Sequence, residues 1–135
     1  MDFSHINWLA AIVAGLSSFM IGGLWYSKSV FGNAWMVDSN LTDEQIKTGG
    51  NPVKIFGFTA LFSLIMAANL AIFLSGPKTD VAWGAEAGFL AGIWTFCAIA
   101  THSLFELKSW RHIFINGGYS VVSLTLMGAI IGLWR

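Results

Sequence analysis

The stretch "IFGFTALFSLIMAANLAIFLSGP", residues 55–77, runs for 23 residues without one Asp, Glu, Lys or Arg. About 20 consecutive apolar residues are enough for a helix to cross the hydrocarbon core of a bilayer. Three further stretches lack these charged residues as completely, and they cover residues 3–27, 87–105 and 113–134. The sequence therefore predicts four membrane-spanning helices.

The composition agrees with a chain dissolved in lipid. Charged residues make up 10% of the 135 residues, whereas soluble globular domains carry about 25%. A soluble bundle of four buried helices is the alternative, and each of its helices would need a continuous polar face toward water. None of the four stretches offers one. We therefore expect a single all-α transmembrane domain over residues 1–135.

We place the spans at about residues 6–26, 53–74, 81–107 and 113–134. Four spans put both termini on the same side of the membrane. Most Lys and Arg residues flank the first and third loops, and the positive-inside rule places such loops in the cytoplasm. These residues are Lys28, Lys47, Lys54, Lys108 and Arg111, against Lys78 and Arg135 on the side of the termini. Both termini are therefore predicted to lie outside.

The first loop is the one connection with room for structure of its own. Phe31 and Trp35 share a helical face with Val30, so we expect a short amphipathic segment along the membrane surface. With Trp25 they supply amphipathic or apolar rings suited to the membrane–water interface. Thr42 and Gln45 fit a capping box, which predicts a second short helix before Pro52 opens the next span. The predicted fold is a four-helix integral membrane bundle with this interfacial segment in its first loop.

Small residues predict where the spans pack, because helices in lipid associate where their backbones can approach closely. Stripes of such residues contain Gly15, Gly22, Gly84, Gly88, Gly128 and Gly132. Asn69 and Glu86 lie at similar predicted depth, so we expect them to share a hydrogen bond that joins the second and third spans. The small-residue surface that remains predicts a homo-oligomer.

Polar residues gather toward the predicted cytoplasmic ends of the spans. His102 and Glu106 are four residues apart and lie on one helical face. Asn116, Tyr119 and Tyr26 fall within one or two helical turns of the same surface. If these side chains converge, they form a pocket that faces the cytoplasm and binds or passes a small solute or ion. In the plainer alternative, Glu106 pairs with Lys108 or Arg111, and Asn116 caps or bridges helices.

Several classes of function are disfavoured. The middle of the membrane carries no ionisable group, which argues against an ion-coupled carrier. No nucleophile and base, phosphate loop or zinc spacing is recognisable, so we expect no enzymatic activity, no cofactor and no metal. A metal at His102 and Glu106 would lack a third ligand, since His112 falls beyond the predicted end of that helix. The zero net charge gives no reason to expect nucleic acid.

The competing function is that of a non-catalytic accessory protein. In that hypothesis the helices and the first loop contact a partner membrane protein within the lipid bilayer.

Several short motifs resemble a known family. They are N-W-L-A at residues 7–10, G-x-L-W-Y-S with F-G-x-A-W-M within 22–36, L-T-x-E at 41–44, L-F-E with S-x-R within 104–111, and I-N-x-G-Y with L-M-G-A-I-I-G within 115–132. Together they cover almost the whole chain and are similar to the family called domain of unknown function 1761. This resemblance implies a small four-span protein of the bacterial inner membrane with no assigned activity.

Carried over residue by residue, the resemblance marks a set of motif positions in this sequence. They are Asn7, Trp25, Tyr26, Phe31, Gly32, Trp35, Met36, Glu106, Asn116 and Tyr119. Ser120 departs from the family pattern, in which the resemblance leads us to expect a histidine. Several of these positions fall at the predicted cytoplasmic surface, where the polar residues also gather.

Overall fold

The computed structural model describes residues 3–134, and helices are the one kind of regular secondary structure within them, as predicted. A 3-10 turn (η1, Phe3–His5) precedes six α-helices. These are α1 (Trp8–Trp25), α2 (Gly32–Asp38), α3 (Asp43–Gly49), α4 (Pro52–Phe73), α5 (Val81–Phe105) and α6 (Trp110–Leu133). Four of them, α1, α4, α5 and α6, are long and apolar enough to cross a bilayer.

Side-chain caps fix where most of the helices begin. Asn7, Asn51, Asp80 and Ser109 each accept a hydrogen bond from a backbone N–H in the first turn of the helix that follows. The capping box predicted for α3 is confirmed, because both of its reciprocal bonds are present. The Ser109 cap starts α6 at Trp110, three residues before the predicted position. The helix therefore includes residues 110–112, which the prediction left in the loop.

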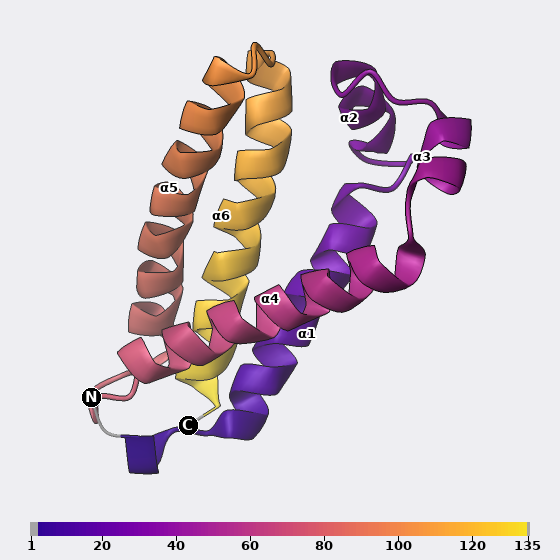
Figure 1. The fold of residues 1–135 in the computed structure, drawn as a ribbon. Helices are drawn as coiled ribbons and strands as arrows, with labels where there is room; N and C mark the ends of the chain where they lie inside the picture. The colour runs from indigo at the N-terminus through magenta and orange to yellow at the C-terminus, as the bar shows by residue number, and fades with distance from the viewer. Residues whose placement is uncertain (1–2, 135) are drawn as a thin grey trace.

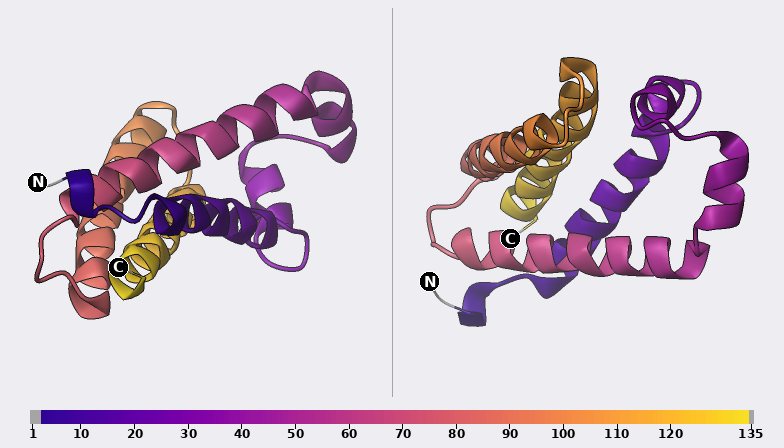
Figure 2. Two further views of the ribbon diagram at one scale, coloured as in Figure 1. Left: turned by 90° about the horizontal axis from the view of Figure 1, so that it is seen from below. Right: turned by 45° about the horizontal axis from the view of Figure 1, so that its top comes forward.

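The spanning helices follow each other in space in the order α4, α1, α6, α5. Figure 1 shows α5 and α6 as an antiparallel pair, with α4 crossing α1 at a steep angle. The main contacts join α5 to α6, α1 to α4 and α1 to α6, and no such interface joins α4 to α5. The second view in Figure 2 shows α4 extending away from α5 toward α3. The predicted bundle is therefore open along one side.

The open side corrects one expectation. Asn69 Nδ2 donates a hydrogen bond to the Ile65 carbonyl of its own helix at 2.9 Å. Glu86 is exposed on α5 and has no hydrogen bond with Asn69 in the described part of the chain. The second and third spans are thus not joined by this pair, because α4 and α5 diverge.

Glycines set the distance between α5 and α6. A methyl group on Gly84 would overlap the Gly128 carbonyl, and one on Gly128 would overlap the Gly84 carbonyl. A methyl group on Gly88 would overlap the Leu124 carbonyl in the same way. Backbone therefore lies directly on backbone along this interface, which holds the two helices in one register.

The other predicted packing glycines also lie at helix contacts. A Cβ on Gly15 would be 3.0 Å from Leu64 Cδ2 on α4, and one on Gly22 would be 3.2 Å from Tyr119 Oη on α6. A Cβ on Gly132 would overlap the Asp80 carbonyl just before α5. Small residues thus let α1 approach both of its neighbours.

The apolar core lies at the end of the bundle where the termini are. Its buried residues come from the start of α1, the end of α4, the start of α5 and the end of α6; they are Ala11, Ala14, Ala67, Leu70, Ala71, Leu74, Ala87, Leu124, Met127 and Ile131. Small and apolar side chains pack this half of the molecule. The other half carries the polar contacts described below.

The glycine contacts predict a position-dependent cost. Gly128→Val should destabilise the chain by about 3 kcal/mol or more, because the carbonyl it would meet belongs to backbone that cannot rotate away. Gly57→Val is the matched control, since a Cβ at Gly57 meets nothing within 4 Å. Reversible unfolding by sodium dodecyl sulfate, followed by circular dichroism, measures both. Equal losses at the two positions would contradict the described interface.

Candidate functional site

Most polar side chains on the spanning helices are satisfied within their own helix. Hydroxyl or amide groups of Thr59, Asn69, Thr95, Thr101 and Thr125 each donate to the carbonyl four residues earlier. A bond to the carbonyl groups of its own helix satisfies a polar side chain in lipid without a partner from another helix. Polar contacts that do cross between helices therefore stand out.

Such contacts gather where the end of α1 meets the beginning of α6. Tyr26 Oη donates a hydrogen bond of 2.7 Å to Asn116 Oδ1. Asn116 Nδ2 lies 3.1 Å from His112 Nε2, one turn earlier on α6. The Trp25 indole N–H donates to the Ile115 carbonyl at 2.8 Å. The bonds of Tyr26 and Trp25 join the C-terminal end of α1 to the first turns of α6, and the bond of His112 lies within α6.

A second pair continues this contact toward the middle of the membrane. Tyr119 Oη donates to the Ser18 carbonyl at 2.8 Å and lies 3.2 Å from the Ser18 hydroxyl. Its ring is 5.6 Å from that of Tyr26, in an edge-to-face arrangement. We call Ser18, Tyr26, His112, Asn116 and Tyr119 the α1–α6 polar cluster.

His112 is the least satisfied member of this cluster. The residue is 8% exposed, and its Nδ1 atom is buried with no hydrogen-bond partner among the described residues. A buried polar atom without a partner costs about 1–3 kcal/mol, so such atoms are uncommon and call for an explanation. The imidazole is thus held by Asn116 on one nitrogen and left open on the other.

The short helix α2 lies over the cluster. Arg111 donates two hydrogen bonds, of 2.8 and 2.7 Å, to the carboxylate of Asp38 at the end of α2. The Trp35 ring packs edge-to-face on Tyr26 at 5.9 Å, and Phe31 lies 4.8 Å from Trp25. The three interfacial aromatics of the sequence therefore pack on or beside the site.

The ion pair between Arg111 and Asp38, which holds α2, lowers the pKa of Asp38. The Arg111 guanidinium keeps the pKa of the Asp38 carboxyl below its usual value, and nearby His112 contributes in the same direction. The Asp38 side chain is only 10% exposed. The second ion pair of this region, Lys28 with Asp43 at 2.8 Å, is more than half exposed on both sides and is screened by solvent.

The structure brings together some of the residues predicted from sequence and leaves others apart. Tyr26, Asn116 and Tyr119 meet in the cluster. His102 is exposed on α5, and Glu106 is the exposed C-cap of that helix; neither has a hydrogen bond to the cluster in the described part of the chain. Among the described residues, Glu106 forms no ion pair with Lys108 or with Arg111, which binds Asp38. The other part of that alternative is confirmed, because Asn116 bridges α1 and α6 through Tyr26.

Two cluster members, His112 and Ser18, were missed by sequence reasoning. His112 lies beyond the end of the helix that carries His102 and Glu106, as expected, but the predicted fourth span began after it, whereas the Ser109 cap includes it in the first turn of α6. The available signal was the spacing: Ser109 stands three residues before His112, and Asn116 follows it by one helical turn. Within residues 3–134, no three His, Cys, Asp or Glu side chains lie close enough to hold a metal ion.

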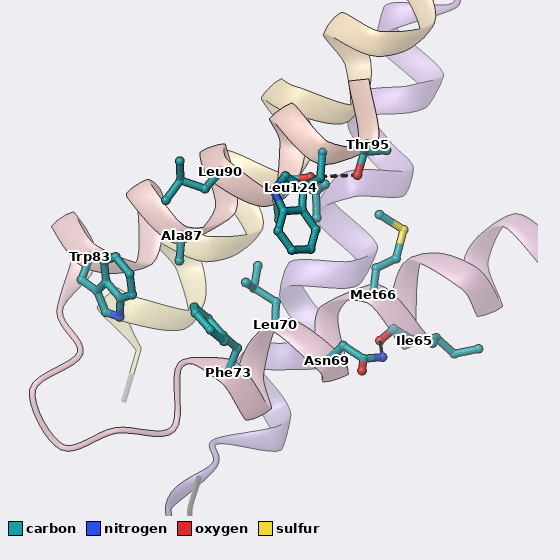
Figure 3. A pocket seen from close by; sticks show the side chains of 12 residues that line it. Ile65, Met66, Asn69, Leu70, Phe73, Trp83, Ala87, Leu90, Thr95 and Leu124 are labelled. Carbon is teal, nitrogen blue, oxygen red and sulfur yellow. Dashed lines mark hydrogen bonds between the residues drawn. The ribbon is translucent and has the colours of Figure 1, made fainter. Parts of the chain in front are cut away.

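A groove of about 690 Å³ lies on the open side, between α4 and α5. Figure 3 shows Leu70 and Phe73 on one wall facing Ala87 and Leu90 on the other. Its polar groups at Asn69 and Thr95 are bonded to their own helices. The groove therefore accepts apolar groups, and it is separate from the α1–α6 polar cluster.

These features define the chain as a helical, multi-pass membrane protein with a polar junction at one end of its bundle. The chain belongs to the family described as protein of unknown function (DUF1761), whose family model matches residues 9–132. The resemblance found in the sequence motifs is thereby confirmed. Comparison with curated proteins and with solved structures finds no match.

The Asp38 contact makes α2 sensitive to acid. Because its pKa is lowered by folding, Asp38 stabilises the docked α2 fully above the unfolded-state pKa of about 3.9, and this stabilisation is lost as the pH falls through the lower folded-state value. A spin label on Val37→Cys, in a Cys97→Ser background, should remain ordered at pH 5 and become mobile well below pH 4 in electron paramagnetic resonance spectra.

Two variants control that experiment. Asp38→Asn should make the label mobile at every pH, since the carboxylate that binds Arg111 is gone. Asp43→Asn should leave the spectra unchanged, because its ion pair is exposed. A label that stays ordered in Asp38→Asn would show that the ion pair does not hold α2.

Proposed function

We propose that this protein binds a small hydrogen-bonding solute at the α1–α6 polar cluster, from the side of the membrane where α2 lies. The observation that carries the proposal is the buried, unpartnered Nδ1 of His112 beside Asn116. By the positive-inside rule this side is the cytoplasm, since Lys28, Lys47 and Arg111 lie there. A solute from the cytoplasm would then reach the cluster past α2, which covers it.

The origin of the site residues supports a binding role. Three separate family motifs contribute to it: Trp25 and Tyr26, then Phe31 and Trp35, and finally Asn116 with its neighbour Tyr119. Apolar and small side chains are sufficient to pack these helices elsewhere in the bundle. A buried histidine, amide and two phenols are therefore more than the fold requires, and ionisable groups within a membrane domain are by default functional.

The shape of the bundle favours binding over passage through a single subunit. The buried polar side chains of α6 are those of His112, Ser120 and Ser123. Beyond them, Met127 and Ile131 pack with Ala14 in the apolar core. A solute that enters the cluster meets this core, so release is back toward the same side unless the helices move.

A second candidate function is an accessory role, and the α4–α5 groove favours it. The groove leaves apolar side chains such as Phe73 and Leu90 uncovered on the open side. A partner membrane protein, or a second copy of the chain, could place apolar surface there. In that case Leu90→Glu should abolish co-purification from mild detergent, while Tyr26→Phe should leave it intact.

Ligand-dependent stability tests the binding proposal. A solute present at 100 times its dissociation constant stabilises the folded state by about 2.7 kcal/mol, which is readily seen as a rise in melting temperature. We expect at least one compound in a panel of small cytoplasmic metabolites to stabilise the protein in nanodiscs. Tyr26→Phe and Asn116→Leu should each remove most of that stabilisation.

Glu106→Gln is the matched control, since Glu106 lies outside the cluster and the variant should respond like the parent. The proposal fails if no compound in the panel stabilises the parent. It also fails if Glu106→Gln removes the response while Tyr26→Phe keeps it, because the solute would then bind on α5.

A further inference from the structure

The hydrogen bonds of the cluster determine which nitrogen of His112 carries the proton. Asn116 Oδ1 accepts from the Tyr26 hydroxyl, so the amide group is oriented with Nδ2 toward His112. An amide N–H₂ group is a donor only, so the facing Nε2 of His112 acts as the acceptor. The neutral imidazole must then carry its proton on Nδ1. The chain Tyr26, Asn116, His112 is therefore a directional series of donors and acceptors.

This tautomer makes the unpartnered Nδ1 a hydrogen-bond donor. Nδ1–H is a donor that is buried and lacks an acceptor among the described residues. An oxygen atom with a free lone pair satisfies it, as in a carbonyl or a carboxylate. The ligand must accordingly present an acceptor oxygen to His112.

The charges around the imidazole distinguish a neutral acceptor from an anionic one. Asp38 is close enough for His112 to affect its titration, and the hydrogen bonds to Arg111 hold it beside the cluster. Arg111 and Asp38 neutralise each other through two hydrogen bonds. A ligand carboxylate buried beside His112 would therefore find no free cation among the contacts of the cluster, and burying an unpaired charge is costly. A neutral carbonyl does not incur this cost.

The Tyr26 hydroxyl supplies the complementary group. It donates to Asn116 and retains acceptor lone pairs on Oη. The cluster therefore offers one donor, His112 Nδ1–H, and one acceptor, Tyr26 Oη, and an amide carries the group that complements each of them.

We infer that the solute is a small neutral amide, whose carbonyl oxygen accepts a hydrogen bond from His112 Nδ1–H. This inference rests on the proposed function, since it names the chemical class of ligand for the same cluster. It does not involve the α4–α5 groove or the residues His102 and Glu106.

Nitrogen nuclear magnetic resonance tests the tautomer directly. The full-length chain, labelled with ¹⁵N-histidine and reconstituted in nanodiscs at pH 8, contains three histidines. His112→Gln identifies the His112 signals by their loss, and His102→Gln serves as the control. We expect a protonated Nδ1 and an unprotonated Nε2 at His112. The opposite tautomer would overturn the inference.

A titration with two probes of similar size tests the ligand class. Acetamide should shift the His112 Nδ1 resonance in a saturable manner, and acetate should require at least tenfold higher concentration for the same shift. Tyr26→Phe should weaken the response to acetamide, because the phenol no longer orients Asn116 or accepts from the ligand. Equal or stronger shifts with acetate, or no shift with either probe, would contradict a neutral amide.

The two proposals can fail separately. If the metabolite panel yields a carboxylate whose stabilising effect depends on Tyr26, binding at the cluster stands and the amide inference is wrong. If no metabolite stabilises the protein but acetamide shifts His112 as expected, the donor tautomer stands and the proposed physiological binding fails.

Discussion

The constraint on which this structure depends is the absence of water from the hydrocarbon core of a bilayer. Each polar group within the spanning helices must find its partner in the protein. Threonine hydroxyls on α4, α5 and α6 do so by bonding to their own helix, so they make no demand on neighbours. Bonds between spanning helices are concentrated at the junction of α1 and α6, where Tyr26 meets Asn116 and Tyr119 meets Ser18. His112 Nδ1 is the exception, because it is buried and has no hydrogen-bond partner among the described residues, and the proposed site is based on this atom.

Close packing of small residues determines where the junction of α1 and α6 forms. Glycines on α5 and α6 bring two backbones into direct contact, which fixes the rotation of α6 about its own axis. With α5 on one side, the face of α6 that carries His112, Asn116 and Tyr119 is turned toward α1 and α2. Gly22 on α1 then leaves room for the Tyr119 hydroxyl to reach the α1 backbone. Packing by small residues and recognition by polar ones are therefore parts of one arrangement.

Much of the fold could be predicted from the sequence, because its signals are one-dimensional. Uninterrupted apolar length predicted the four spans, and the spacing of Thr42 and Gln45 predicted the cap of α3. The rotation of each span was harder to predict. In a soluble protein, the polar face of a helix shows which side points outward. Lipid is as apolar as the protein interior, so the sequence of a spanning helix does not distinguish its lipid-facing side from its protein-facing side in this way. The sequence therefore placed His102 and Glu106 at the correct end of α5 and predicted that they join the cluster, whereas in the structure both are exposed and have no hydrogen bond to it among the described residues.

Two other features, the divergence of α4 from α5 and the start of α6, were not predicted correctly from the sequence. The tight turn between α4 and α5 gives no sign that the two helices diverge, and their separation depends instead on how α4 crosses α1 at Gly15. The start of α6 was predicted three residues late, because charge was used to end the span although the Ser109 cap begins the helix earlier. That small difference in boundary moved His112 from a loop into the site.

A double-mutant cycle between Tyr26 and Asn116 tests the central claim most directly, since these residues are distant in sequence and joined by one hydrogen bond of 2.7 Å. Tyr26→Phe, Asn116→Leu and the double variant would be compared by reversible unfolding in detergent. The structure predicts a coupling free energy of about 0.5–1.5 kcal/mol between the two positions, in the range of hydrogen bonds between helices in membranes. Strictly additive losses would contradict the polar junction of α1 and α6, and with it the site proposed for this protein.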